Sequence, residues 1–242
     1  MESMANNLME KRSCPKIIEN RVNENFFHKW SAHMAYVLGY FCADGCMFMN
    51  PRGSKYAAFY STDNGSILNI KRLLNSKNKI TTRERSNANW KKLFSLQIGS
   101  RKIYSDLLKL GLSPAKADRL SLPEVPGEYL RHFVRGYFDG DGCVSYGYYK
   151  RKNRSRKIFL LMVRFASGSK NFLGNLLKTL SLTANLKGGC ISKNMGGFHL
   201  IYSKNDSGKL FNFMYNGVSN KEYLERKYTK FQKAMKIIGV VA

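Results

Sequence analysis

The stretch Gly39-Tyr-Phe-Cys-Ala-Asp-Gly-Cys46 returns about a hundred residues later as Gly136-Tyr-Phe-Asp-Gly-Asp-Gly-Cys143. The two copies agree at the first Gly, the Tyr-Phe pair, the Asp before the last Gly, that Gly and the Cys. Apolar residues recur at intervals of three and four up to each copy, which predicts a helix over about residues 31–44, with Ser31 as N-cap, and a second that ends at Asp141. The chain therefore contains an internal repeat.

The likeness between the two halves continues downstream of these motifs. After each helix come two strand-like runs joined by a basic turn, then a helix, two more short strands and a closing helix. The order of secondary-structure elements αββαββα thus occurs twice along the chain. We therefore expect an α+β fold in which two tandem repeats, each with an antiparallel, saddle-shaped sheet, pack about a pseudo-twofold axis.

The repeat divides the chain into five segments. A short linker with three of the five prolines separates the repeats, so the repeats must lie side by side. An amphipathic helix is predicted after the second repeat. The expected segments are residues 1–25 as an N-terminal extension, 26–112 as the first repeat, 113–127 as the linker, 128–219 as the second repeat and 220–242 as a C-terminal helix and tail.

The chain is strongly basic. Its 242 residues include 41 Lys and Arg against 16 Asp and Glu, which gives a formal charge of +25. Such a charge favours a polyanionic partner, and the interleaving of basic residues with Tyr and Phe favours nucleic acid over a membrane or an acidic protein. A membrane surface is the weakest partner, because no helix segregates its cations against a broad apolar face. A merely well-solvated basic chain is the alternative that charge alone leaves open.

Cysteine usage and hydropathy indicate the compartment. The five cysteines are odd in number and lack a CxxC spacing, so they signal neither a zinc site nor a disulfide framework. The sequence shows no leader and no apolar run long enough to span a bilayer. We expect a soluble intracellular protein in a reducing compartment, either a bacterial cytoplasm or an organelle matrix.

The chemistry is expected where the two motif helices end. Gly39 and Gly136 lie on the apolar faces, where a missing side chain lets two helices approach closely. Asp44 and Asp141 then come together at helix C-termini, beside exposed carbonyl groups. These oxygens suit a hard divalent cation such as Mg²⁺, which hydrolysis of a phosphodiester requires. The expected metal-binding residues are Asp44 and Asp141, with helix-end carbonyls at Ala43 and Gly140.

The Asp-Gly pairs admit other interpretations. Gly45 and Gly142 suit the left-handed position that ends a helix, so Asp44 and Asp141 could be turn residues alone. Duplication of the whole motif favours the metal site. An EF-hand loop in the second motif is rejected because Lys150 stands where the bidentate Glu should be.

The stretches Val37-Leu-Gly-Tyr-Phe-Cys-Ala-Asp-Gly45 and Val134-Arg-Gly-Tyr-Phe-Asp-Gly-Asp-Gly142 resemble the two motifs of LAGLIDADG homing endonucleases. The resemblance covers nearly the whole chain. It implies a monomer that cuts both DNA strands across the minor groove and leaves short 3′ overhangs. Since no protein-splicing sequence is seen around the nuclease unit, we expect a free-standing or intron-encoded product and not an intein. The resemblance also implies that the last acid of each motif binds Mg²⁺, with Mn²⁺ as a substitute and Ca²⁺ as an ion that binds without supporting cleavage.

The resemblance implies further site residues. Family members carry a Lys after the fourth strand of each repeat, where Lys102 lies in the first half and Lys204 is the nearest candidate in the second. Both are therefore expected to be catalytic. Two motif positions depart from the family pattern. Cys42 replaces an acid and is expected to be a small packing residue, whereas Arg135 replaces a small residue and is expected to point outward.

The sheets are expected to contact DNA. A two-stranded β-ribbon fits the major groove, Arg can pair bidentately with guanine, and most Lys contacts go to phosphate. Because the halves differ strongly outside the motifs, the target is expected to be long and asymmetric. The expected DNA-binding residues are Lys55, Arg83, Arg85, Lys91, Tyr146, Tyr148, Lys150, Arg154, Arg156, Arg164 and Lys187.

Two alternatives keep the fold but change the activity. A maturase would assist splicing of its host intron RNA, and a regulator would bind DNA without cutting it. Retention of both acids favours the nuclease over the regulator, and the sequence leaves a coexisting maturase activity open.

Overall fold

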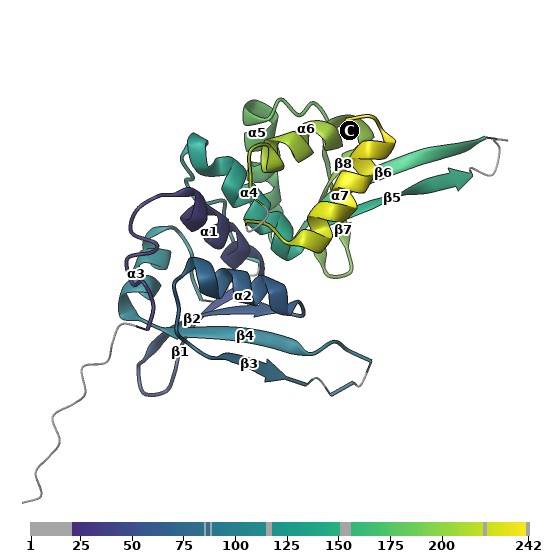
Figure 1. The fold of residues 1–242 in the computed structure, drawn as a ribbon. Coiled ribbons are helices and arrows are strands. Elements are labelled where there is room, and N and C mark those ends of the chain that lie inside the picture. The colour runs from purple at the N-terminus through teal and green to yellow at the C-terminus, as the bar shows by residue number, and fades with distance from the viewer. Residues whose placement is uncertain are drawn as a thin grey trace, which may run out of the picture.

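The computed structural model describes residues 21–84, 86–87, 89–114, 118–150, 156–219 and 222–240. It has two halves, each with a four-stranded sheet and helices packed on one face of that sheet (Figure 1). The first half consists of α1 (Ala32–Asp44), β1 (Gly45–Met49), β2 (Lys55–Ser61), α2 (Asn64–Leu73), β3 (Ile80–Arg83), β4 (Leu93–Gly99) and α3 (Arg101–Lys109). The second half consists of α4 (Gly127–Asp141), β5 (Gly142–Lys150), β6 (Lys157–Ser167), α5 (Lys170–Thr183), β7 (Cys190–Asn194), β8 (Gly197–Ser203) and α6 (Lys204–Tyr215), and is followed by α7 (Glu225–Ile237).

Both halves follow the same topology. The strand order is β1-β2-β4-β3 in the first sheet and β5-β6-β8-β7 in the second, and all neighbouring strands are antiparallel. Equal connectivity in the two sheets is what a duplicated domain produces. The prediction of an α+β fold with two αββαββα repeats is therefore confirmed.

The N-terminal end of the described chain attaches to the first half. Residues 1–20 of the expected extension lie outside the described residues. The N–H of Asn23 donates to the Leu74 carbonyl over 3.2 Å, and the Ser100 hydroxyl donates to the Glu24 carboxylate over 2.6 Å. The C-terminal helix begins at Glu225, later than the sequence predicts. In the ranges that the structure describes, no helix is long and apolar enough to cross a membrane.

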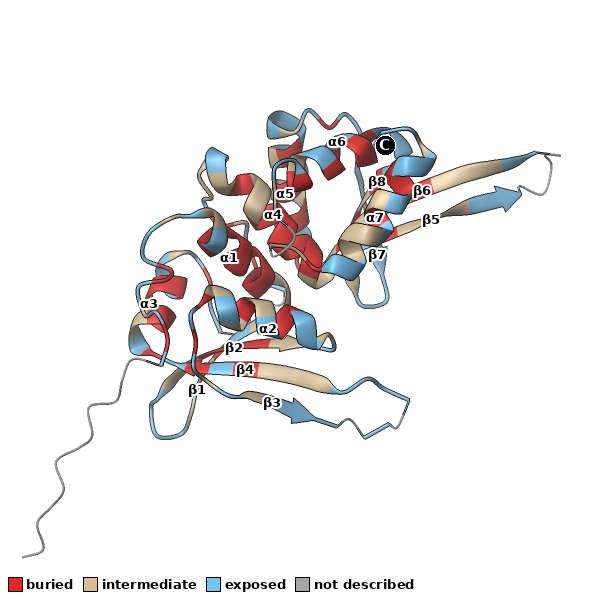
Figure 2. Cartoon of the chain, viewed as in Figure 1, coloured by how far each residue is buried: buried red, intermediate tan, exposed pale blue. Residues whose placement is uncertain are grey.

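Helices α1 and α4 pack against each other at the centre of the molecule, where buried residues are concentrated (Figure 2). A Cβ atom at Gly39 would collide with the backbone carbonyl of Phe133, and one at Gly136 would collide with the carbonyl of Tyr36. Each of these carbonyls lies three residues before the glycine of its own helix, so the two contacts are equivalent under a twofold rotation. The helices therefore cross backbone to backbone, with the pseudo-twofold axis between them.

Gly45 and Gly142 end these helices differently from the prediction. Their φ angles are −91° and −89°, which is extended backbone and not the left-handed conformation. Strands β1 and β5 begin at the glycines themselves, so no turn separates helix from strand. A Cβ atom at either position would collide with Phe41 or Phe138 in the last helical turn. Glycine is therefore required here for space and not for its φ angle.

The expectation that Arg135 points outward is wrong. Its side chain is fully buried, and the guanidinium donates to the carbonyls of Glu222, over 2.9 Å, and Met214, over 3.0 Å. It also contacts His132 Nδ1 at 2.9 Å. Burial, reinforced by the Arg135 charge, lowers the pKa of His132 to about 4, so this imidazole is neutral and accepts the hydrogen bond. The buried charge is tolerated because its donors have acceptors, and it ties α4 to α6 and to the segment before α7.

Replacement of Arg135 by Met should lower the free energy of unfolding by about 3 kcal/mol. The Glu222 and Met214 carbonyls would lose their donor, and a buried acceptor without a partner is costly. Urea titration of the folded chain measures the change. The matched control is Arg101→Met at an exposed residue, where we expect less than about 0.5 kcal/mol. Equal stability of the two variants would show that the buried contacts of Arg135 contribute nothing.

Candidate active site and nucleic-acid interface

Asp44 and Asp141 are the last residues of α1 and α4, and both are partly buried. Because the two helices cross at equivalent positions, their C-terminal ends come together. A Cβ atom placed at Gly140 would touch the side chain of Ala43 and lie 3.4 Å from the Asp44 Oδ2 atom. The structure thus gathers the four residues that the sequence assigns to the metal site.

The two helix ends form an electronegative site in a basic protein. Two carboxylates add to the partial negative charge that each helix carries at its C-terminus. Burial, followed by the charge of Asp141, raises the pKa of the Tyr137 phenol well above its usual value, and Asp44 acts in the same direction. Tyr137 therefore stays protonated, and its hydroxyl donates to the Ala166 carbonyl over 2.6 Å. Such a site attracts a cation.

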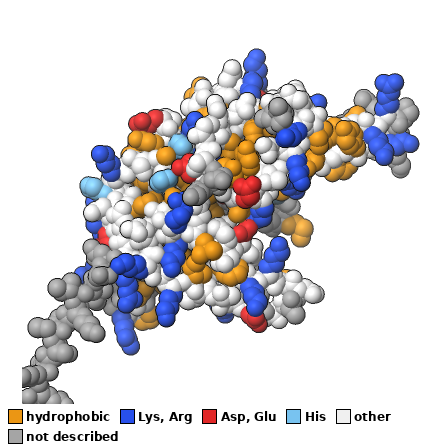
Figure 3. Space-filling model, in the orientation of Figure 1, with side chains coloured by type: hydrophobic (Ala, Val, Ile, Leu, Met, Phe, Trp, Pro, Cys, Tyr) orange, Lys and Arg blue, Asp and Glu red, His pale blue; other side chains and the backbone are white. Residues whose placement is uncertain are grey.

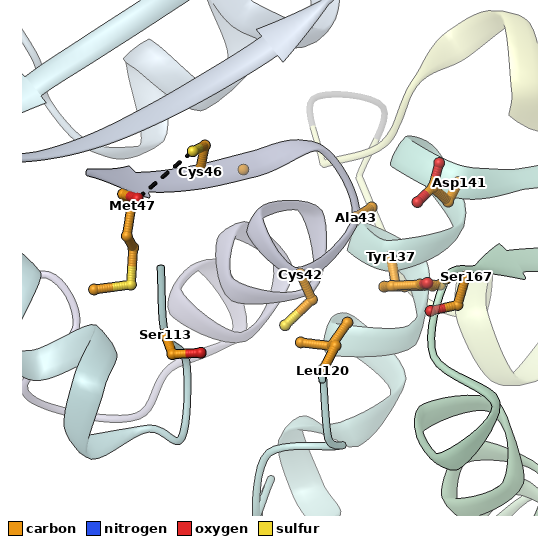
Figure 4. Close-up of a pocket in the computed structure, with 11 residues that line it drawn as sticks. Cys42, Ala43, Cys46, Met47, Ser113, Leu120, Tyr137, Asp141 and Ser167 are labelled. Atoms are coloured by element: carbon orange, nitrogen blue, oxygen red, sulfur yellow. Dashed lines mark hydrogen bonds between the residues drawn. The ribbon is translucent and has the colours of Figure 1, made fainter. Parts of the chain in front are cut away.

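A cavity of about 320 Å³ lies beside the helix ends, and residues of both halves line it (Figure 4). In the close-up, Ala43 and Asp141 lie near each other where the two helices end, with Tyr137 and Ser167 next to Asp141. The lining residues are Cys42, Ala43, Gly45, Cys46, Met47, Ser113, Leu120, Tyr137, Asp141, Ser167 and Gly168.

Lys227 of α7 is a site residue that sequence reasoning missed. Its ammonium donates to the carbonyls of Phe138 and Gly140, each over 2.8 Å, at the C-terminal end of α4. Burial lowers the pKa of Lys227 to about 8, while the nearby charges of Asp139, Asp44 and Asp141 act in the opposite direction. Lys227 thus places a positive charge where helix dipole and acids are negative. Because its ammonium donates to the Gly140 carbonyl oxygen, one lone pair of that oxygen is already used. The role of this carbonyl as a metal ligand stays a prediction.

Asp139 attaches the C-terminal segment to the paired helices. It occupies the position of Cys42 in the other motif, and it is buried. Its Oδ2 atom accepts from the Tyr36 hydroxyl and from the N–H of Leu224, both over 2.8 Å. Burial raises the pKa of Asp139 to about 6. The contact to Tyr36 crosses from α4 to α1, so Asp139 fixes the helix pair and the segment before α7 in one arrangement.

The two lysines taken from the resemblance lie at helix starts. The Lys102 ammonium pairs with Asp106 over 2.9 Å within α3. Lys102 also lines a cavity with Asn23, Lys77 and neighbouring residues, and none of the metal-site residues line that cavity. Lys204 is the first residue of α6 and is exposed. Their catalytic role therefore rests on the resemblance alone.

The sheets present one face to the helices and leave the other face open. On β6, Leu161, Val163 and Phe165 are buried against the helices, whereas the residues between them are partly exposed on the open face. Strand pairing places Arg164 on the open face opposite Cys143, and Arg83 on the open face of the first sheet opposite Leu93. These two predicted DNA-binding arginines lie where a groove of DNA can reach them.

Four other predicted DNA-binding residues share the face of their sheet that the helices cover, and their contact with DNA stays a prediction. The Lys55 ammonium lies over the Tyr104 ring of α3, 5.3 Å from its centroid. Tyr146, Tyr148 and Lys150 share a face with buried Val144, because side chains alternate along a strand. Lys91, Arg156 and Lys187 are exposed in the segments before β4, β6 and β7, whereas Arg85 and Arg154 lie outside the described residues.

Comparison with known proteins agrees with the repeat. The family model described as a LAGLIDADG-like domain matches residues 31–110 and again residues 128–226. No curated protein matches the chain.

Solved structures share the fold at low sequence identity. The homing endonuclease I-WcaI bound to its DNA recognition sequence has a TM-score of 0.60 at 14% identity, over 86% of this chain and 91% of that one. The LAGLIDADG meganuclease I-AabMI bound to uncleaved DNA has a TM-score of 0.58 at 16% identity, over 87% and 92%. I-SmaMI, bound to an uncleaved DNA target in the presence of calcium ions, has a TM-score of 0.55 at 15% identity, over 87% and 92%. Since the family model matches most of the sequence, once in each half, the chain belongs to the LAGLIDADG-like domain family and carries two such domains in one polypeptide.

Proposed function

We propose that the chain is a homing endonuclease that hydrolyses both strands of a long, asymmetric DNA site with divalent metal ions and leaves short 3′ overhangs. The observation that carries this proposal is the meeting of Asp44 and Asp141 at the ends of two helices related by a pseudo-twofold axis. The two strands of a DNA duplex are themselves related by twofold axes, so a paired centre of this kind can present one acid to each strand. The formal charge of +25 supports a polyanionic substrate.

The residues at the helix ends fit a hard divalent cation. Asp44 and Asp141 offer carboxylate oxygens, and the carbonyls of Ala43 and Gly140 are of the oxygen type that Mg²⁺ and Ca²⁺ prefer. Among the described residues, no group of three or more His, Cys, Asp and Glu side chains gathers, so the remaining ligands would be water and DNA phosphate oxygens. Bound there, such an ion lowers the pKa of an attacking water and stabilises the leaving 3′ oxygen.

The chain's own residues supply position and charge. The close crossing at Gly39 and Gly136 holds the two acids in one orientation relative to each other. The phenol of Tyr137 remains protonated beside Asp141, and Lys227 keeps a positive charge at the end of α4. The Lys227 charge offsets part of the repulsion between two carboxylates and an approaching phosphate before any ion is bound.

Replacement of Lys227 by Gln should lower kcat for DNA cleavage by about 100-fold with little change in KM, because its charge lies at the reacting centre and not in the groove contacts. The matched control is Lys233→Gln, an exposed lysine of the same helix, where we expect less than about a threefold change. Thermal melting of both variants separates a loss of charge from a loss of α7 docking. Equal kcat values for well-folded variants would remove Lys227 from the site.

The test of the proposed function uses DNA that carries the uninterrupted insertion locus of the chain's own gene. We expect a plasmid with this locus to be cut once in Mg²⁺ or Mn²⁺, to be bound but left uncut in Ca²⁺, and to be left uncut in EDTA. Specific binding without cutting in any divalent ion would instead favour a DNA-binding regulator. Splicing assays with the host intron RNA show whether a maturase activity accompanies cleavage or replaces it.

A further inference from the structure

The long hairpin of β5 and β6 protrudes beyond its sheet. Strand β8 pairs with β6 only along residues 162–167, so residues 157–161 have β5 as their one described strand neighbour. Figure 3 shows hydrophobic side chains along this hairpin and Lys and Arg side chains near its outer end. A hairpin of this shape is long enough to follow a groove of DNA.

The open face of this hairpin carries three aliphatic side chains in a row. Ile158, Leu160 and Met162 alternate along β6 with residues that face the helices, and all three are partly exposed. We call them the aliphatic stripe. Outward positions of an antiparallel sheet normally carry polar residues, so three successive aliphatic side chains there need a reason.

The stripe is not part of the protein core. Tyr146 and Phe159, on the opposite face of the same hairpin, pack against the described hydrophobic core, and no residue of the stripe does. Arg164 continues the same face towards the helix ends, and its guanidinium donates to the Ser145 hydroxyl over 2.8 Å. The stripe therefore lies between the basic outer end of the hairpin and Arg164, along the path that DNA would take from the active site.

The corresponding face of the first half is different. On this face, β2 carries Tyr56 and Tyr60. The neighbouring strand β4 carries Ser95 and Gln97, and β3 carries Thr81. The Thr81 and Ser95 hydroxyls are 2.7 Å apart and can donate to and accept from base edges. Strand β2 has Tyr56 at the position of Met162 and begins at Lys55, so the first half has no strand counterpart of the aliphatic stripe.

One base feature in the major groove matches an aliphatic side chain. Thymine presents a C5-methyl group there, whereas the other groups on the base edges are hydrogen-bond donors and acceptors. Burying polar edges against Ile, Leu and Met would leave them unpaired, which is costly. Burying methyl groups against the same side chains is favourable.

We propose, on the basis of the proposed function, that the aliphatic stripe reads thymine methyl groups in the half-site bound by the second repeat. Met162 and Ile158 lie opposite Ser145 and Tyr149, four and eight residues beyond Asp141. At about 3.4 Å per residue and per base step, the thymines lie roughly 4 to 8 base pairs from the cut. Alternate side chains are about 6.8 Å apart, or about two base pairs.

The test begins with sites selected from a randomised DNA duplex library in Ca²⁺, so that binding is measured without cutting. In the selected duplex, deoxyuridine replaces thymidine in one half-site at a time, which removes the methyl group and keeps base pairing. We expect affinity to fall about fourfold for each contacted methyl removed, and on the order of 50-fold for three. Deoxyuridine in the other half-site should change affinity less than about threefold.

The protein-side control is a variant with Ile158→Thr, Leu160→Thr and Met162→Gln. It should select the same bases in one half-site, lose the thymine preference in the other, and bind thymine and uracil duplexes equally well. The half-site in which the variant loses its thymine preference is the one bound by the second repeat. Specific binding that ignores the methyl groups, or self-association that the variant abolishes, overturns the inference and leaves the proposed function intact. A chain that selects no sequence at all contradicts both.

Discussion

Replacing Gly39 with Ala should lower the free energy of unfolding by at least about 3 kcal/mol, a large effect for one methyl group. The added Cβ atom meets the Phe133 carbonyl, which belongs to a helix backbone and cannot rotate away. Helices α1 and α4 would have to separate, and the side chains packed around their crossing would lose contact. Urea titration measures the loss, and Gly136→Ala should match it because its contact with Tyr36 is equivalent.

Gly174 provides the matched control for this prediction. It lies inside α5, and an added Cβ atom there would meet no heavy atom within 4 Å. Since alanine is favoured over glycine in a helix interior by about 1 kcal/mol, Gly174→Ala should stabilise the chain slightly. If Gly39→Ala is as stable as Gly174→Ala, the two helices do not cross at their glycines.

Replacement of either Asp44 or Asp141 by Asn should reduce double-strand cleavage by at least about 1,000-fold while DNA affinity is kept. Loss of a metal-binding carboxylate removes several kcal/mol of transition-state stabilisation, and about 1.4 kcal/mol corresponds to a factor of ten in rate. Binding should not weaken, because each change removes a negative charge that repels phosphate. Single-turnover cleavage and a binding titration in Ca²⁺ measure the two effects separately.

The control for the acids is Glu124→Gln, which removes one negative charge from an exposed residue beside Trp30, at a separate cavity. We expect its cleavage rate to equal that of the wild type within about twofold. If Asp44→Asn and Asp141→Asn also cut normally, the two acids are turn residues before glycine, as the sequence alone permits.

The fold and the position of the acids could be predicted because they depend on local patterns that occur twice. Helical spacing, Asp before Gly and the order of strands are all visible along the sequence. The conformation of Gly45 was not predictable in this way, because it depends on Phe41 occupying the space of a Cβ atom. Likewise, Arg135 is buried because carbonyls of α6 and of the segment before α7 accept its donors, and these lie far away in the sequence.

Which strand residues lie on the open faces of the sheets is harder to predict from the sequence, for a geometric reason. Side chains alternate across a strand, so a shift of one residue moves a side chain from the open face to the helix face. Residue type alone favours Tyr146 and Tyr148 as DNA contacts, whereas strand pairing places their neighbours on the open face. Lys227 was missed because the sequence offers 41 Lys and Arg residues and does not show which one reaches the end of α4.

The most direct measurement maps both cut positions on an end-labelled duplex of the selected target, in Mg²⁺ and in EDTA. Two acids related by a pseudo-twofold axis should cut the two strands at positions related by the same axis, across one minor groove, with short 3′ overhangs in Mg²⁺ and intact strands in EDTA. Cuts that persist in EDTA, or specific binding with both strands left intact in every divalent ion, would contradict a paired metal site at Asp44 and Asp141.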